Sequence, residues 1–146
     1  MTSDDLHSLL RRGLLVLLVI GATGLVAELV LSEHYEDVPQ LIPFGLLTLT
    51  LIATAWHWMD GMKRSLRAFQ FVMLLLVIAG PVGIFLHVKG NYEAEREFDP
   101  SRVGLDLLLE VIRGEAPMLA PGSLVQFGLL GLLYAYRHPA LFNKEK

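Results

Sequence analysis

Four long apolar segments separated by charged loops constrain this chain more than any other feature of its sequence. The segments cover residues 13–32, 38–58, 67–88 and 119–137. Each is near the length of about 17 to 25 residues that a helix needs to cross a hydrocarbon core about 30 Å thick. In this chain 53% of the residues are hydrophobic and 18% are charged. Soluble domains average about 45 to 50% apolar and about 25% charged residues. We therefore predict an all-α integral membrane protein, a bundle of four transmembrane helices that forms a single membrane domain over residues 1–146.

The sorting of charges between these segments predicts the orientation of the chain in the lipid bilayer. When the loops are assigned to alternating sides, one side carries eight Lys and Arg against four Asp and Glu, and the other carries four against eleven. Basic loops stay in the cytoplasm, so both termini should be cytoplasmic and residues 89–118 should face outward. The first apolar run exceeds the roughly 7 to 15 residues of a signal-peptide core, and no cleavage site follows it, so we expect an anchor. These features are typical of a multi-pass protein of a bacterial inner membrane.

The chain contains no cysteine. Disulfides, thiol nucleophiles, iron-sulfur clusters and thiolate zinc sites are thereby excluded for this chain alone. No serine-histidine couple, phosphate-binding loop or two-metal motif stands out either, so the sequence does not favour an enzyme. Nothing in it indicates nucleic acid as a partner.

Pairs of glycines three residues apart occur in three of the four segments. Helices in lipid associate through close backbone approach at small residues, because the lipid tails are as apolar as leucine. Residues three apart lie on one face of a helix, so we expect these faces to turn inward, with Pro81 kinking the third segment near its outer end. The pairs are Gly21 and Gly24, Gly80 and Gly83, and Gly128 and Gly131.

The outward segment of residues 89–118 divides into two parts. Acidic residues alternate with others over residues 91–98, and an extended strand there would project its three glutamates from one edge. Residues 101–113 predict an amphipathic helix, with polar residues recurring at intervals of four, four and three. We expect this extracytoplasmic helix, between the third and fourth spans, to lie on the membrane surface or to cap the bundle.

Glu28 needs an explanation, because it is an acid inside an apolar span about one turn from the outer boundary. Insertion scales put an acidic residue at a helix centre at about +2.5 to +3.5 kcal/mol, and less near the interface, so it should be paired, protonated or facing water. His87 lies at a comparable depth on the glycine face of the third span. We therefore predict an outward-facing pocket built around Glu28 and His87, which binds a divalent metal ion or handles protons.

The outer turn and loop supply more potential ligands to this pocket. His34 and Asp37 are three residues apart, so on a helical turn they could share one ion. Imidazole with carboxylate suits zinc, iron, manganese, nickel or copper, although the Glu-x-x-His motif of di-iron bundle proteins does not occur. For the individual loop acids, plain solvation is the simpler interpretation. The predicted metal ligands are Glu28, Glu33, His34, Asp37, His87 and Glu93, and the other polar members of the pocket are Gln40, Asn91 and Glu95.

Other interpretations stay open. A bis-histidine haem would need His34 and His87 to face each other, but His34 is rotated about 120° from the Glu28 stripe and should face a different neighbour. The glycine faces could instead serve a homo-oligomer or a larger membrane complex, in which the protein is a non-catalytic structural or assembly subunit. We interpret His57, beside two tryptophans, as an interfacial residue, and His138 as part of the cytoplasmic tail.

Overall fold

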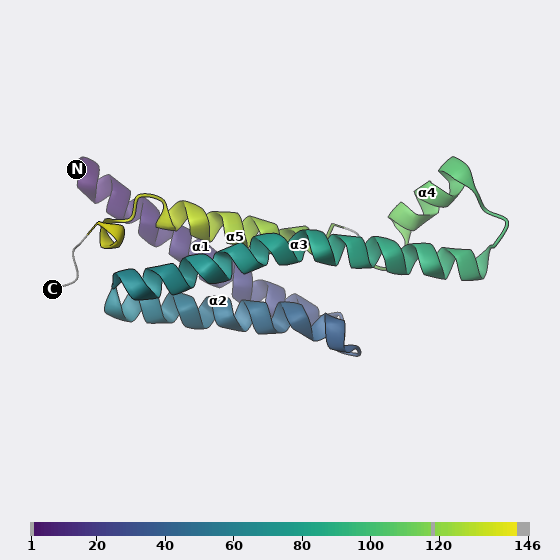
Figure 1. Ribbon diagram of the computed structural model, residues 1–146, viewed down its shortest axis with the longest axis horizontal. Coiled ribbons are helices and arrows are strands. Elements are labelled where there is room, and N and C mark those ends of the chain that lie inside the picture. Colours follow the sequence, from purple (N-terminus) through teal and green to yellow (C-terminus); the bar gives the residue numbers. More distant parts are fainter. Residues whose placement is uncertain (1, 118, 143–146) are drawn as a thin grey trace.

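The computed structural model describes residues 2–117 and 119–142, in which all regular structure is helical. Residues 1, 118 and 143–146, which belong to the predicted termini and to the end of the predicted outward segment, lie outside the described residues. The longer helices lie along the long axis of the molecule, and a short helix lies beside the far part of one of them (Figure 1). The prediction of an all-α protein is confirmed. The elements are α1 (Ser3–Leu31), η1 (Val38–Gln40), α2 (Leu41–Asp60), α3 (Lys63–Phe98), α4 (Gly104–Arg113), α5 (Gly122–Ala135) and η2 (Pro139–Leu141), where η denotes a 3-10 turn.

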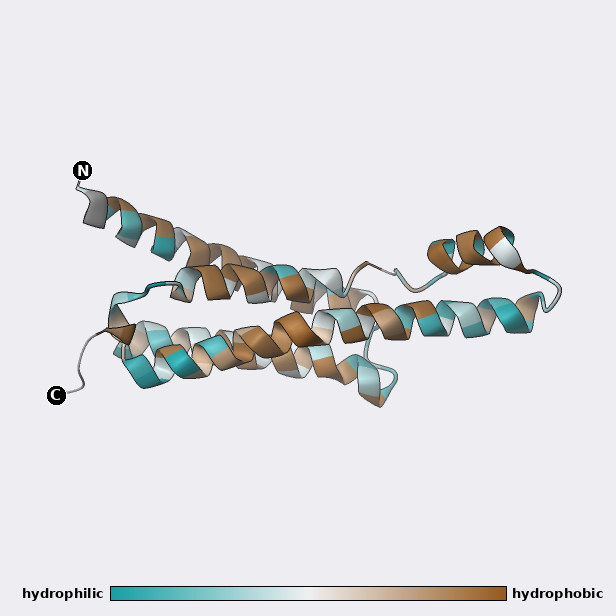
Figure 2. Cartoon of the chain, turned by 45° about the horizontal axis from the view of Figure 1, so that its top comes forward, coloured by the Kyte–Doolittle hydropathy of each residue, from teal (hydrophilic) through white to brown (hydrophobic). Residues whose placement is uncertain are grey.

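Three of these helices are long and apolar enough to cross a membrane, over Asp5–Leu31, Val38–Asp60 and Lys63–Phe98. α5 is also apolar but shorter, and it occupies most of the predicted fourth span over residues 119–137. Apolar residues dominate the central parts of the helices, and polar residues gather toward their ends (Figure 2). The three long apolar helices are consistent with a membrane protein.

Local chemistry explains where the long helices begin and end. α1 begins after Thr2, which exchanges backbone–side-chain hydrogen bonds with Asp5 in a capping box. α2 follows Pro39 in η1, and Pro43 fits the first turn of α2 because its missing N–H would have no intrahelical partner there. Gly61 ends α2 at a φ of 58°, in the left-handed region that glycine adopts without strain, and turns the chain into α3.

The expected glycine faces lie in the contacts that α5 makes with α1 and, above all, with α3. A Cβ atom on Gly128 would lie 2.6 Å from the carbonyl oxygen of Met73, so only glycine permits this approach. Gly24 meets no atom of a described residue within 4 Å, so its expected inward placement is wrong. The glycines that pack against a neighbouring helix are Gly21, Gly80, Gly83, Gly128 and Gly131.

α3 continues ten residues past the end of its predicted span at residue 88. The expectation of an extended strand over residues 91–98 is therefore wrong. The Glu, Ala and Arg residues of this stretch are strong helix formers, and Lys89 and Glu93 form an ion pair one helical turn apart, at 3.5 Å. With 36 residues, α3 is roughly 54 Å long, which exceeds a hydrocarbon core of about 30 Å.

α4 folds back along the far part of α3 (Figure 1). It begins at Gly104, three residues after the predicted start, because the Asp99 carboxylate accepts hydrogen bonds from the N–H and the hydroxyl of Ser101 and holds the chain in a turn. Val111 is buried and Leu107 is half-buried, while the other apolar side chains of α4 are exposed. The predicted amphipathic helix is present, and it stands alongside α3.

Candidate functional site

Two of the predicted ligands come together at the end of the bundle that carries the α1–α2 turn and α4, which we call the α4 end. The rings of His34, in that turn, and His87 of α3 have centroids 5.9 Å apart. The expectation that His34 faces a different neighbour is therefore wrong, because α1 ends at Leu31 and the turn departs from the helical rotation. Burial, together with the neighbouring His87, lowers the pKa of His34 and so favours its neutral imidazole.

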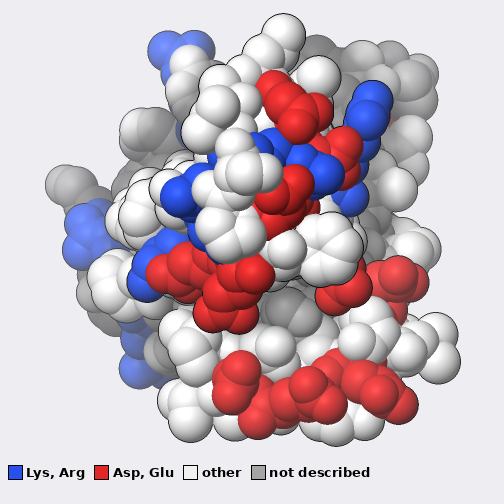
Figure 3. Space-filling model, turned by 90° about the vertical axis from the view of Figure 1, so that its right-hand side faces the viewer, with Lys and Arg blue, Asp and Glu red and all other residues white. Residues whose placement is uncertain are grey.

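Glu28 lies apart from this pair of histidines. Its side chain is exposed on α1, and the described contacts do not include the predicted pairing with His87. Glu33 and Asp37 are exposed in the α1–α2 turn, where Glu33 has a left-handed φ of 54°. Acidic side chains crowd the surface of the α4 end (Figure 3). Because these carboxylates are exposed, water can solvate them without a bound ion.

The other predicted pocket residues are engaged in local contacts. The side-chain oxygen of Gln40 accepts hydrogen bonds from two backbone N–H groups of the α1–α2 turn, at 2.8 and 3.3 Å. Glu93 keeps its ion pair with Lys89, and Glu95 forms an ion pair with Arg102 that joins α3 to the chain before α4. These side chains stabilise the turn and the hairpin of α3 and α4.

His87 and Asn91 hold the loop between α4 and α5. The Asn91 amide donates to the carbonyl oxygens of Val111, at 3.0 Å, and Ala116, at 2.9 Å, and its oxygen accepts from the Ala116 N–H, at 3.1 Å. His87 Nδ1 lies 3.0 Å from the carbonyl oxygen of Pro117. Since a carbonyl can only accept, Nδ1 carries the proton, and only Nε2 of His87 remains for a ligand. Both polar side chains thus bind backbone groups in the last turn of α4 or in the loop that follows it.

The predicted set of metal ligands is not assembled at this end. Among residues 2–117 and 119–142, no group of three or more His, Asp and Glu side chains could hold a metal ion. The contact between His34 and His87 is what the structure contributes toward such a site.

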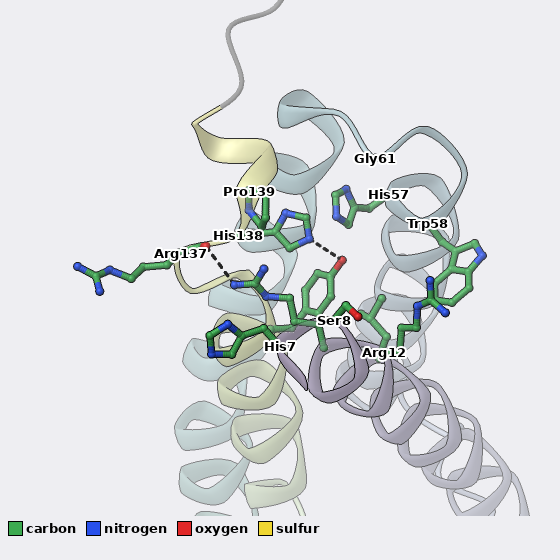
Figure 4. Close-up of a pocket in the computed structure, with 12 residues that line it drawn as sticks. His7, Ser8, Arg12, His57, Trp58, Gly61, Arg137, His138 and Pro139 are labelled. Atoms are coloured by element: carbon green, nitrogen blue, oxygen red, sulfur yellow. Dashed lines mark hydrogen bonds between the residues drawn. The ribbon is translucent and has the colours of Figure 1, made fainter. Parts of the chain in front are cut away.

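A cavity of about 590 Å³ opens at the opposite end, which carries the α2–α3 turn and the first and last described residues and which we call the termini end. α1, α2 and α5 enclose it together with the chain that follows α5 (Figure 4). Its wall combines several basic and imidazole side chains with one phenol, and no Asp or Glu lines it in the part of the chain that the structure describes. The lining residues are His7, Ser8, Arg11, Arg12, Leu15, His57, Trp58, Gly61, Tyr134, Arg137, His138 and Pro139.

His57 is oriented by a chain of hydrogen bonds on the side of its ring that carries Nδ1. This atom lies 3.0 Å from the hydroxyl of Ser65, and that hydroxyl reaches the Asp60 carboxylate and the carbonyl oxygen of Met62. Because neither of these acceptors has a proton to give, Ser65 must accept from His57 Nδ1–H. In the neutral imidazole Nε2 is then the basic nitrogen, on the opposite side of the ring.

A second chain of hydrogen bonds orients Tyr134 and His138. The N–H of Ala140 donates to His138 Nδ1, at 3.2 Å, so in the neutral ring Nε2 carries the proton. His138 Nε2 lies 3.2 Å from the hydroxyl oxygen of Tyr134 and donates to it, which leaves the Tyr134 hydroxyl proton for another acceptor (Figure 4). The rings of His57 and His138 have centroids 5.2 Å apart, so the two chains meet in the wall of the cavity.

Three arginines are among the residues that line the cavity. Arg11 donates through Nη2 to the carbonyl oxygens of Tyr136, at 3.3 Å, and Arg137, at 3.0 Å, which ties α1 to the end of α5. The side chain of Arg137 itself extends away from the other lining residues (Figure 4). Burial, followed by the positive charges of His57 and Arg11, lowers the pKa of His138 to about 4. His138 is therefore neutral near pH 7, and Arg11 and Arg12 supply the permanent charge.

Sequence reasoning missed this cavity although it had two signals for it. His57 and Ser65 are each four residues from Gly61, so a tight turn at Gly61 between antiparallel helices places them opposite each other. Tyr134 and His138 are four apart, the spacing at which side chains meet on a helical turn. From the sequence, we interpret His57 as an interfacial residue and His138 as part of the tail. These interpretations did not reveal the pairs that the two histidines form with Ser65 and Tyr134.

No family model matches the chain, and neither a curated protein nor a solved structure shows significant similarity to it.

Proposed function

We propose that the protein crosses a bacterial inner membrane four times, with both termini in the cytoplasm, and that it binds a phosphate-bearing anion in the cavity at the termini end. The observation that carries this proposal is the cavity itself, whose lining among the described residues includes arginine, histidine, serine and tyrosine and no Asp or Glu.

The course of α5 supports a fourth crossing. A Cβ on Gly83 of α3 would meet Pro121, just before α5, and Arg11 of α1 holds the backbone just after it. α5 therefore spans much of the length shared by the three longer helices, although its 14 residues cover only roughly 21 Å. Inside a bilayer every backbone N–H and C=O group needs a hydrogen-bond partner from the protein. The helices around the segment before Pro121, and the loop held there, can supply such partners at the α4 end.

The arginines at the termini end support the cytoplasmic assignment and the choice of ligand. Lys and Arg near the ends of spans favour the cytoplasmic side. Guanidinium groups bind phosphate oxygens through parallel charged hydrogen bonds. Arg11 uses Nη2 for backbone carbonyls, so its remaining N–H groups can bind an anion together with Arg12. The Tyr134 hydroxyl proton supplies a neutral donor in the same wall.

Titration of the purified protein in detergent with inorganic phosphate, followed by calorimetry, tests this proposal. Arg12→Gln should weaken binding about tenfold or more, because a hydrogen bond to a charged group contributes about 1.5 to 3 kcal/mol. Arg67→Gln is the matched control, since Arg67 is an exposed arginine of α3 that does not line the cavity. Equal affinities in the wild type, Arg12→Gln and Arg11→Gln would rule the phosphate site out.

A divalent metal ion at the α4 end is the second candidate, and the approach of His34 to His87 is the observation that favours it. Two imidazoles with water suit zinc, copper or nickel. Elemental analysis of protein prepared without chelator should show metal that His87→Ala and His34→Ala both lose, and an absorption spectrum would reveal haem at the same time. Equal, negligible metal in the wild type and both variants would exclude this candidate.

A further inference from the structure

An apolar groove runs along the outside of the bundle between α1 and α2. Its volume is about 320 Å³, and its wall is almost entirely apolar. The threonine in it, Thr54, donates its hydroxyl to the carbonyl oxygen of Thr50, at 2.7 Å, so this polar group is already satisfied within α2. The groove is lined by Leu15, Val16, Val19, Ile20, Leu51, Thr54, Ala55 and Trp58.

The groove joins the basic cavity. Leu15 of α1 and Trp58 of α2 line both spaces, so the two meet at these side chains. From there the groove follows α1 to Ile20 and α2 back to Leu51, which is a distance of roughly 10 Å along the helices. Two adjoining depressions therefore share these two side chains, one cationic at the termini end and the other apolar toward the middle of two candidate spans.

A basic cavity followed by an apolar groove is complementary to an amphiphile with an anionic headgroup. A soluble phosphate compound would use the cavity alone, and an apolar helix of a partner would gain nothing from the arginines. A phospholipid uses both parts, because its phosphate lies at the depth of the basic residues that flank a span and its acyl chain extends into the hydrocarbon region. Basic pockets between helices on the cytoplasmic side are a known mode of recognition for anionic lipid headgroups.

We infer that the ligand is an anionic glycerophospholipid, whose phosphate lies in the basic cavity and one of whose acyl chains lies in the groove between α1 and α2. This inference rests on the proposed phosphate site and adds the tail to it. Arg11 and Arg12 select the headgroup, and the groove retains the chain.

Native mass spectrometry in detergent tests the inference with phosphatidylglycerol and phosphatidylcholine that carry the same acyl chains. The wild type should bind phosphatidylglycerol at least tenfold more tightly than phosphatidylcholine. Ala55→Phe fills the groove with a ring and should weaken phosphatidylglycerol binding about tenfold, while binding of inorganic phosphate stays unchanged. Ala27→Phe places the same ring on an exposed alanine of α1 that lines neither space, and it should bind lipid as the wild type does.

Trp58 supplies a second measurement that does not depend on the folding of Ala55→Phe. The chain has two tryptophans, so Trp56→Phe leaves Trp58 as the only one. Phosphatidylglycerol brominated on its acyl chains should quench Trp58 at several-fold lower mole fraction than brominated phosphatidylcholine, and Arg12→Gln should abolish this difference.

The outcomes separate the two proposals. If inorganic phosphate binds and depends on Arg12, but the two lipids quench Trp58 equally and Ala55→Phe binds phosphatidylglycerol like the wild type, the lipid inference is overturned and the phosphate site stands. If Arg12→Gln changes neither phosphate nor lipid binding, the proposed function itself fails.

Discussion

The two ends of this bundle use similar polar residues in opposite ways. At the α4 end, the Asn91 amide binds backbone groups of α4 and of the loop after it through both its nitrogen and its oxygen, and His87 binds the same loop through Nδ1. At the termini end, His57 is held through Nδ1 and keeps Nε2 on the other side of its ring. His138 is bonded through both ring nitrogens, and this leaves the Tyr134 hydroxyl proton for another acceptor in the wall of a cavity with arginines. A polar residue near a membrane therefore indicates a binding site only when its hydrogen-bonding capacity is not already used by the fold. This distinction cannot be made by residue type.

The largest effect should come from Asn91→Ala, which removes three hydrogen bonds from a buried position of the α4 end. Because the partner backbone groups would be left unsatisfied, we expect the free energy of unfolding to fall by about 3 kcal/mol, and proteases to cleave near Gly114. Phosphate affinity at the termini end should not change. Chemical unfolding in detergent measures the free energy of unfolding, and limited proteolysis measures cleavage near Gly114. Gln126→Ala, at an exposed position, is the control for both. If Asn91→Ala also weakens phosphate binding, the two ends of the bundle are not independent.

Ser65→Ala should have the next largest effect, at the termini end. It removes the buried hydroxyl that connects His57 to Asp60, so unfolding should become easier by about 2 kcal/mol. Phosphate should bind several-fold more weakly, because the His57 ring is no longer held in one orientation. Ser32→Ala removes an exposed hydroxyl directly after α1 and serves as the control. If the ring-nitrogen chemical shifts of His57 are the same in Ser65→Ala and the wild type, the hydrogen bond between His57 and Ser65 is contradicted.

His138, at the termini end, should contribute more to the pH dependence of the protein's stability than His34, at the α4 end. His138 has a pKa of about 4 in the folded protein, against 6.5 as its ordinary value, because it is buried and faces His57 and Arg11, with the Tyr134 hydroxyl as its hydrogen-bond partner. Between these values the unfolded chain binds the extra proton, so stability present above pH 6.5 is lost as the pH falls toward 4. His138→Asn should flatten thermal unfolding temperatures over this window more than His34→Asn, although the pKa of His34 is lowered as well. Equal slopes in wild type and His138→Asn would refute it.

His87→Ala should have the smallest effect of the four. The side chain gives one hydrogen bond to the loop, at Pro117, so its loss should cost about 1 kcal/mol. This loss should be smaller than that of Asn91→Ala in the same unfolding assay. A larger loss would mean that the contact between His34 and His87 contributes strongly to the α4 end.

The positions of the helices could be predicted because apolar runs of membrane-spanning length leave little choice of structure. The end of α3 could not be predicted from hydropathy, since residues 89–98 are polar and yet strong helix formers, and α3 continues through them into the hairpin with α4. Pro81, where the sequence predicts a kink, lies inside a helix that continues on both sides. Hydropathy thus locates the spans better than it locates the helices.

The residues of the candidate site are harder to predict, because depth in a span does not fix the direction of a side chain. Depth and the glycine stripes together pair Glu28 with His87, but Gly24 and Glu28 are both exposed, so the inward face of α1 does not continue from Gly21 to Glu28. The predicted direction of His34 continues α1 past its real end at Leu31. The cavity at the termini end depends on the Gly61 turn and on residues after α5, whose positions follow from tertiary contacts.

α3 connects the two ends as one rod. Phe69, near its beginning, has its ring centroid 6.4 Å from that of His57, and Asn91, near its far end, carries the hairpin loop. Over roughly 54 Å, a tilt of about 5° at the cavity would move Phe98 by roughly 5 Å. A change in packing at the termini end would therefore be amplified along α3 into a displacement of the hairpin at the α4 end.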